Sequence, residues 1–185
     1  MHGGKLPPVP TPSTAADEKE FLEKDLYDAL RWSFVSAVTW HATKGRECVL
    51  AMNTNLVQSR ALYEFYFAKV SEPDDARALQ FAPSWAEPES PLYLKYMKRG
   101  KPANKRIFHL VYDRNIAANA GGVGHDGPDH LKNQVLEFAK DLRRITELFI
   151  GCVKPQFQAI VRTTLDNALS EAKKTADCHG IPNPL

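Results

Sequence analysis

Residues 128–152 read PDHLKNQVLEFAKDLRRITELFIGC, and this stretch carries the strongest periodic signal in the chain. Its apolar residues recur at alternating intervals of four and three: Leu131, Val135, Phe138, Leu142, Ile145, Phe149 and Cys152. That spacing places them on one face of an α-helix. Pro128 suits the first helical position because its fixed φ is already helical. The stretch therefore predicts a long helix with one buried face.

Further helices are predicted on both sides of this one. Downstream, Pro155 opens a helix whose apolar side is formed by Phe157, Val161, Leu165, Ala168 and Ala172. Upstream, residues 17–43 and 46–69 predict two helices separated by a short break, which together form an antiparallel hairpin. Residues 102–118 predict a fifth helix. Because no stretch alternates as a strand does, we expect an all-α bundle of five main helices.

The stretch between residues 70 and 101 contains four prolines that leave room only for short helical turns, at residues 74–80 and 91–98. We expect Phe81 and Trp85 to anchor it to the core. The other expected non-helical parts are a disordered lead at 1–16, a glycine-rich loop at 119–127 and an irregular tail at 177–185. Residues 17–176 then form one domain.

Composition excludes several classes of protein. The chain has 185 residues, 43% of them hydrophobic, and a net charge of +2. Its three cysteines lack the spacing of a zinc site or a disulfide framework, which predicts reduced thiols and a cytoplasmic location. No stretch approaches the roughly 18–20 apolar residues that a membrane helix needs. We expect no cofactor.

Arg60 and Glu64 form the first candidate site. Arg60 lies on a helical stripe with Val49, Leu56, Tyr63 and Phe67. A guanidinium is costly to bury without a partner, and Glu64 at i,i+4 supplies one. Alternatively, Arg60 faces a groove and binds phosphate or carboxylate. We predict the structural role, in which Arg60 pairs with Glu64 or with a residue of the helix at 102–118 and joins two helices beside the groove. Arg60→Ala would then cost about 3–5 kcal/mol.

The second candidate site is centred on His109, which has Lys105 and Arg106 one turn before it and Asp113 one turn after it. A histidine beside cations suits acid–base chemistry on a phosphodiester. The alternative is a solvated polar helix face. His41, in contrast, is expected to be a hydrogen-bonded core histidine.

Two further features have both a functional and a structural interpretation. The stretch containing His125, Asp126, Asp129 and His130 offers metal ligands, but the same residues make a good helix start, and we expect no metal. A basic run consists of Lys95, Lys98, Arg99, Lys101, Lys105 and Arg106. It either faces water around a loop or binds phosphates. The glycines of 121–124 follow a predicted helix rather than a strand, so the context of a nucleotide-binding loop is absent.

Three blocks between residues 51 and 114 resemble a set of small all-helical proteins. They are Ser59-Arg60-Ala61-Leu62-Tyr63-Glu64-Phe65-Tyr66, then Asp74-Asp75-Ala76-Arg77-Ala78 with Trp85, then Asn104-Lys105-Arg106-Ile107-Phe108-His109-Leu110 with Arg114. The pattern in turn resembles the HEPN superfamily, whose members are helical bundles. Many of these are metal-independent ribonucleases, and others are inactive relatives. The resemblance implies the same fold here.

The HEPN resemblance also implies roles for individual residues. The superfamily motif is an Arg, usually followed by a polar residue, then a His after four to six intervening residues. His109 and Asn104 match the His and the polar residue, whereas Ala103 or Asn104 occupies the Arg position. Arg60, Arg106 or Arg114 would have to supply the missing cation.

Two hypotheses about function follow. In the first, the chain is a non-catalytic module that binds RNA, a nucleotide or a protein partner. Its anion-binding residues would be Arg60, Asn104, Lys105, Arg106 and Arg114. In the second, it is a ribonuclease with His109 as the acid–base group. The missing Arg favours the first. We also expect a homodimer, because the aromatic residues Tyr63, Phe65, Tyr66 and Phe67 cover much of the circumference of their helix.

Overall fold

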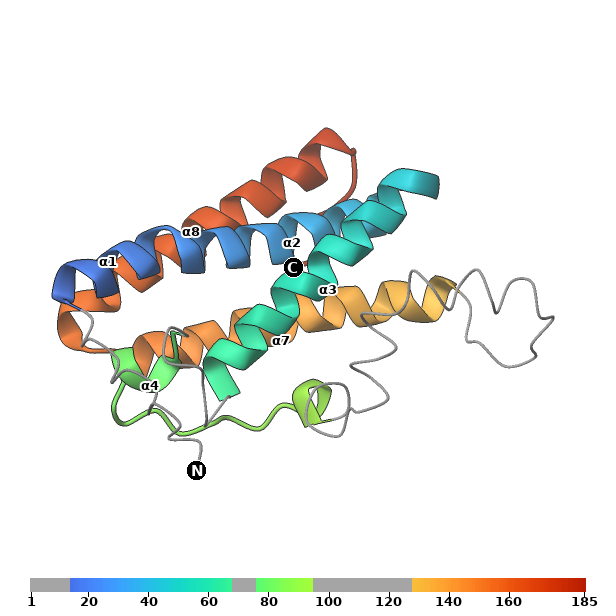
Figure 1. Cartoon of the computed structure of the whole chain (residues 1–185). Helices are drawn as coiled ribbons and strands as arrows, with labels where there is room; N and C mark the ends of the chain where they lie inside the picture. The colour runs from blue at the N-terminus through green and yellow to red at the C-terminus, as the bar shows by residue number, and fades with distance from the viewer. Residues whose placement is uncertain (1–13, 68–75, 95–127) are drawn as a thin grey trace, which may run out of the picture.

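A computed structural model describes residues 14–67, 76–94 and 128–185, with side chains in the last range described from Gln134 onward. Within these residues the chain is all-α and contains no strand. Its helices are α1 (Ala15–Glu23), α2 (Asp25–Ala42), α3 (Gly45–Phe67), α4 (Ala78–Phe81), α7 (Pro128–Cys152) and α8 (Pro155–Cys178). Figure 1 shows α2, α3, α7 and α8 as a bundle in which α1 continues the line of α2. The predicted all-α bundle is thus confirmed.

The first helix begins at a capping box. The Thr14 hydroxyl accepts a hydrogen bond from the Asp17 backbone N–H, and the Asp17 carboxylate accepts one from the Thr14 backbone N–H. The single helix predicted over residues 17–43 is wrong, because Lys24 departs from helical geometry at φ −113° and ψ −66°. Hydrogen bonds continue through it, from Lys24 N to Glu20 O and from Asp28 N to Lys24 O, so the two helices stay nearly in line.

The predicted hairpin of two long helices is formed by α2 and α3. Gly45 has a φ of +67°, which favours glycine, and it lets the chain reverse directly after Thr43 and Lys44. The interface between the two helices includes a buried polar seam: Asn55 donates to the Ser33 backbone oxygen at 2.7 Å, and the hydroxyls of Ser33 and Ser59 lie 3.2 Å apart. The seam satisfies these groups and fixes the register of the hairpin.

The second hairpin pairs α7 with α8, with Pro155 at the first turn of α8 as predicted. The heptad residues of α7 from Val135 to Phe149 are buried, Cys152 is half-buried, and the Leu131 side chain lies outside the described residues. All five residues predicted for the apolar side of α8 are buried. Lys154, between the two helices, forms a 3.0 Å ion pair with Glu18 of α1.

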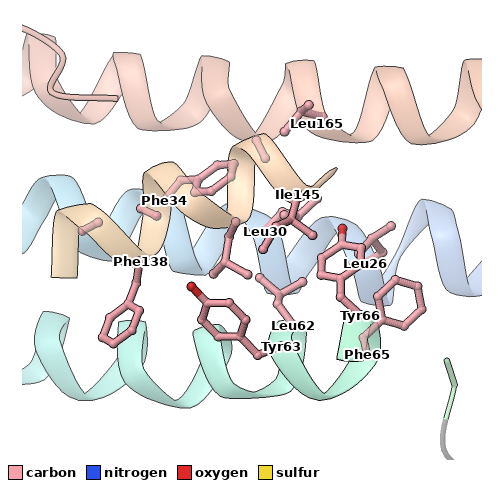
Figure 2. Close-up of a cluster of buried hydrophobic side chains, with 14 of the residues drawn as sticks. Leu26, Leu30, Phe34, Leu62, Tyr63, Phe65, Tyr66, Phe138, Ile145 and Leu165 are labelled. Carbon is pink, nitrogen blue, oxygen red and sulfur yellow. The ribbon is translucent and has the colours of Figure 1, made fainter. Parts of the chain in front are cut away.

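Side chains from all six helices of the described chain form one core. Figure 2 shows Leu26, Leu30 and Phe34 of α2 facing Leu62, Tyr63, Phe65 and Tyr66 of α3, with Phe138 and Ile145 of α7 and Leu165 of α8 completing the cluster. Fully burying a side chain of this size contributes about 1.5–3 kcal/mol. Because α2 contacts α3, α7 and α8, it is the central helix of the bundle.

Residues 76–94 run along α7, from its C-terminal end at Phe81 to its middle at Ser90, as two short turns and extended chain. Of the turn predicted at 74–80, residues 78–80 are helical within α4, whereas Arg77 is extended at φ −135° and residues 74–75 lie outside the described residues. Phe81 and Trp85 are buried as predicted. The Trp85 indole N–H donates to the Tyr66 backbone oxygen at 2.9 Å. The turn predicted at 91–98 is observed at residues 91–94. Residues 95–98, the predicted helix at 102–118, the loop at 119–127 and residues 1–13 of the predicted lead lie outside the described residues. The prediction that the disordered lead extends to residue 16 is wrong, because Thr14 caps α1 and the helix begins at Ala15.

The last helix ends two residues later than predicted, at Cys178, in a Schellman motif. Gly180 takes a φ of +65°, its N–H donates to the Asp177 oxygen, and the Ile181 N–H donates to the Ala176 oxygen. Beyond this stop the chain is irregular, as predicted, but it is not separate from the bundle. Ile181 and Leu185 pack against the core.

Candidate functional site at Asp141

Arg60 is the one predicted site residue whose side chain the structure describes. Its Nε atom lies 2.6 Å from Glu64 Oε1, so the predicted i,i+4 ion pair is confirmed. The predicted burial is wrong, since the Arg60 side chain is 35% exposed and that of Glu64 is 50% exposed. Val49 is also exposed, whereas Leu56, Tyr63 and Phe67 are buried. Arg60 therefore lies at the edge of the apolar face of α3 rather than within it.

The side chains of the other predicted site residues are not described by the structure. Ala103, Asn104, Lys105, Arg106, His109 and Arg114 lie outside the described residues, as do His125 and Asp126. Asp129 and His130 begin α7, but their side chains are not described. No group of side chains that could hold a metal ion occurs among those that are described. His41 is exposed, so its prediction as a core histidine is wrong.

The four aromatic residues that suggested a homodimer are all buried within one chain. Tyr63 lies against Phe138 of α7, Phe65 and Tyr66 against Phe149, and Phe67 against Tyr93 at a ring distance of 4.1 Å. The C-terminal end of α3 is enclosed by α7 and residues 76–94, which accounts for apolar side chains around its circumference. The homodimer remains a prediction, but it needs a different surface.

The most connected polar group in the described residues is the carboxylate of Asp141 on α7. Its Oδ2 accepts hydrogen bonds from the hydroxyls of Tyr63 on α3, at 2.8 Å, and Ser90. Its Oδ1 accepts from the Arg144 guanidinium, with the closest nitrogen at 2.7 Å. The Asp141 side chain is only 10% exposed. This Asp141 cluster, consisting of Asp141, Tyr63, Ser90 and Arg144, joins three parts of the chain.

Ser90 has a second role, as the N-cap of the turn at residues 91–94. Its hydroxyl oxygen accepts the Tyr93 backbone N–H at 3.0 Å, and its backbone oxygen accepts the Leu94 N–H at 3.0 Å. Pro91 occupies the first helical position, where proline is favoured. Arg144 also donates to the Glu89 backbone oxygen at 2.7 Å. Two neighbouring residues of α7 therefore hold the start of this turn.

The electrostatics of the Asp141 cluster favour a structural role, in which its groups donate and accept hydrogen bonds, over a reactive one. Burial raises the pKa of Tyr63, and the nearby Asp141 charge raises it further, so the phenol stays protonated and acts as a donor. Burial likewise raises the pKa of Tyr93, with smaller contributions from the charges of Glu87 and Glu64. Both carboxylate oxygens of Asp141 are occupied by donors, which suits positioning better than proton transfer.

Sequence reasoning missed the Asp141 cluster, although parts of it had local signals. Ser90-Pro91 is the signature of a capped helix start, and Asp141 and Arg144 are spaced as an i,i+3 pair. Their connection to Tyr63 had no local signal, because Tyr63 and Asp141 are 78 residues apart.

A groove lies between α8 and the α1–α2 line. It is lined by Glu23, Tyr27, Ala159, Ile160, Thr163, Thr164 and Asn167. Its one buried hydroxyl, that of Thr164, donates to the Leu22 backbone oxygen at 3.1 Å. The groove thus brings one carboxylate beside neutral polar groups, without a paired base or cation.

Comparisons with protein-family models, with curated proteins and with solved structures find no match. The HEPN resemblance therefore stays a prediction that rests on the three sequence blocks alone. In the described part of the chain, no helix is both long and apolar enough to cross a lipid bilayer.

Proposed function

We propose that this chain is a non-catalytic, HEPN-like helical module that binds RNA through the basic run at residues 95–106. Its anion-binding residues would be Asn104, Lys105, Arg106 and Arg114. Arg60 is a weaker candidate for anion binding than its sequence context suggests, because Glu64 already pairs with it. The proposal rests on the distribution of charge and on the anchoring of the chain immediately before the run.

The distribution of charge is the observation that carries the proposal. The run holds six lysines and arginines and no acidic residue, whereas the rest of the chain sums to a charge of −4, since the total is +2. A segment that concentrates cations within an otherwise acidic chain favours a polyanionic ligand over non-specific solvation. Phosphate contacts would supply the affinity, which should therefore fall with salt.

The anchoring comes from the Asp141 cluster. Ser90 and the Glu89 backbone are bonded to α7, and Tyr93 stacks on Phe67. The basic run begins at Lys95, directly after this fixed turn. A fixed point of departure lowers the conformational entropy that the first basic residues lose on binding.

A ribonuclease that uses His109 as its acid–base group is the second candidate function. Ala103 or Asn104 at the motif Arg position argues against it, because the developing charge on the phosphate would lack its usual cation. We also propose that the module acts as a homodimer, since two-fold dimers are the commonest oligomers of soluble proteins.

Fluorescence anisotropy with a labelled single-stranded RNA tests the binding proposal. The variant Lys101→Gln/Lys105→Gln/Arg106→Gln removes three cations of the basic run, and it should weaken binding at least about tenfold. It should also lower the slope of log affinity against log salt by roughly two, at about 0.7 per phosphate contact on a single strand. The control Lys19→Gln/Lys140→Gln/Lys173→Gln removes the same charge from exposed helix surfaces and should change affinity much less. Equal losses in the two variants would contradict the proposal.

A cleavage assay on the same RNA separates the two functions. The proposal expects intact RNA after incubation with the wild-type protein. Cleavage that disappears in His109→Ala would instead establish the ribonuclease. His41→Ala, which changes an exposed histidine on α2, is the matched control.

A further inference from the structure

The outward face of α3 carries a second regular stripe. The residues at alternating intervals of four and three along this face are Arg46, Leu50, Asn53, Val57, Arg60 and Glu64. At 100° per residue, they lie on the side of the helix opposite Asn55, Ser59 and Leu62, which are buried against the bundle. The stripe therefore points away from the core.

Two exposed apolar residues, Leu50 and Val57, lie on either side of Asn53 in the middle of this outward stripe. Leu50 is 67% exposed and Val57 is 50% exposed, and the exposed Ala61 lies beside them. Single exposed apolar residues are ordinary on a protein surface. Leu50 and Val57 differ from Trp32, Leu79 and Leu148, each exposed alone on its own element, because they are two turns apart on one helix face. A 4-3 spacing of this kind is the pattern of a helix that packs against another helix.

The ends of the stripe carry opposite charges. Arg46 lies in the first turn of α3, where the helix dipole disfavours a cation, and Glu64 lies in the last turn, where it disfavours an anion. Arg46 and Glu64 are five turns apart on the same side of the helix. A second helix running in the opposite direction would bring an anion to Arg46 and a second cation to Glu64, which already pairs with Arg60 of its own chain at 2.6 Å.

We infer that the occupant of this stripe is α3 of a second copy of the chain, packed antiparallel across a two-fold axis near Asn55. In this register Arg46 faces Glu64 of the second copy, and Leu50 faces the aliphatic stem of Arg60 and the adjacent Ala61 of the second copy. At the axis, Asn53 faces Val57 of the second copy, and these small side chains permit close approach. Each contact occurs twice, as an isologous interface requires.

The charges select this direction over the alternative. A parallel pairing would place Arg46 against Arg46 of the second copy and Glu64 against Glu64, and like charges in contact are destabilising. The stripe is also short, about 27 Å for five turns. A contact between two helices of that length falls at the small end of specific interfaces, which predicts a reversible dimer with a dissociation constant in the micromolar range.

This pairing rests on the homodimer of the proposed function, and sedimentation experiments separate the two. Wild-type protein should pass from monomer to dimer as its concentration rises through the micromolar range. Val57→Lys places two charges beside the axis and should weaken the dimer at least about tenfold. The control Leu148→Lys alters a leucine of similar exposure, 46%, on α7 and should leave the dimer unchanged.

A charge exchange tests the register. Arg46→Glu alone creates two Glu–Glu contacts and should weaken the dimer, while it should not harm the monomer, because an anion is favoured at a helix N-terminus. Adding Glu64→Arg restores opposite charges at both ends and should recover most of the lost affinity. Circular dichroism of each variant checks that the fold is retained.

Three outcomes would overturn the inference. A wild-type monomer throughout the concentration range would remove the homodimer as well as its surface. A dimer that resists Val57→Lys would leave the homodimer standing and show that it uses another surface. Failure of the double exchange to recover affinity would contradict the antiparallel register. None of these outcomes bears on RNA binding, which the anisotropy experiment decides.

Discussion

Two acid–arginine pairs in this molecule, Arg60–Glu64 on α3 and Arg144–Asp141 on α7, have similar geometry and different surroundings. Their nitrogen–oxygen distances are 2.6 Å and 2.7 Å. Glu64 is half exposed, whereas Asp141 is nine-tenths buried and also accepts hydroxyls from α3 and from residues 76–94. The comparison teaches that the contribution of such a pair depends on which other groups the carboxylate satisfies.

Replacing the buried carboxylate should have the largest effect. Asp141→Ala leaves the Tyr63 hydroxyl, in a buried site, and the Ser90 hydroxyl without their acceptor. We expect a loss of about 2–4 kcal/mol in the free energy of unfolding, because unsatisfied buried polar groups cost about 1–3 kcal/mol each. Urea denaturation measures it.

Glu147→Ala is the matched control for that change. Glu147 pairs with Arg143 at 3.1 Å on the same helix, and both side chains are more than 40% exposed. Its removal should cost no more than about 1 kcal/mol. Equal losses in the two variants would mean that the connections of Asp141 contribute nothing beyond its ion pair.

Alkaline pH should have the next largest effect, because burial raises the pKa of Tyr63 and of Tyr66. Above the unfolded value near 10, the unfolded chain loses protons that the folded chain retains. Stability is therefore undiminished below about pH 10 and falls by about 1.4 kcal/mol per pH unit for each phenol above it. Denaturation at several alkaline pH values measures this slope.

Tyr63→Phe assigns that slope to the Asp141 cluster. The variant should reduce the alkaline slope by about 1.4 kcal/mol per pH unit, since one phenol that stays protonated in the folded chain is gone. The Tyr66 hydroxyl bonds to Thr146 instead of Asp141, so Tyr66→Phe reports the contribution outside the cluster. An unchanged slope in Tyr63→Phe would show that this phenol does not remain protonated.

The exposed pair should show the smallest effect. Arg60→Ala is now expected to change the free energy of unfolding by less than about 1 kcal/mol, because pairs that are this exposed contribute little. This value replaces the 3–5 kcal/mol that the sequence suggested. If thermal or urea denaturation showed that Arg60→Ala loses several kcal/mol of unfolding free energy, Arg60 would have a structural role after all. The two acid–arginine pairs would then not differ in their contribution to stability.

The sequence predicted the parts of the fold that depend on local periodicity. The 4-3 repeat of α7 and the proline starts of α7 and α8 were sufficient for the second hairpin, and the break before Gly45 was sufficient for the first. The interruption at Lys24 was missed because it changes one residue's dihedral angles and leaves the apolar pattern intact.

The errors share a physical origin in contacts between distant segments. Arg60 was placed in the core because the width of the apolar face of α3 depends on what packs beside it. Tyr63, Phe65, Tyr66 and Phe67 were read as surplus aromatics because their partners on α7 and residues 76–94 lie far away in sequence. In the Asp141 cluster, Asp141 is separated in sequence by 51 residues from Ser90 and by 78 residues from Tyr63, so no local pattern encodes these contacts.

The central position of α2 has a consequence for synthesis on the ribosome. One side of α2 is covered by α3 soon after both helices emerge, whereas the side that packs on α8 waits until the chain has been extended to Cys178. At 5–20 residues per second that wait lasts on the order of ten seconds. Throughout it, the side of α2 that packs on α8 lacks its final cover. The nascent chain is therefore most exposed to chaperones, and to aggregation, before its last helix arrives.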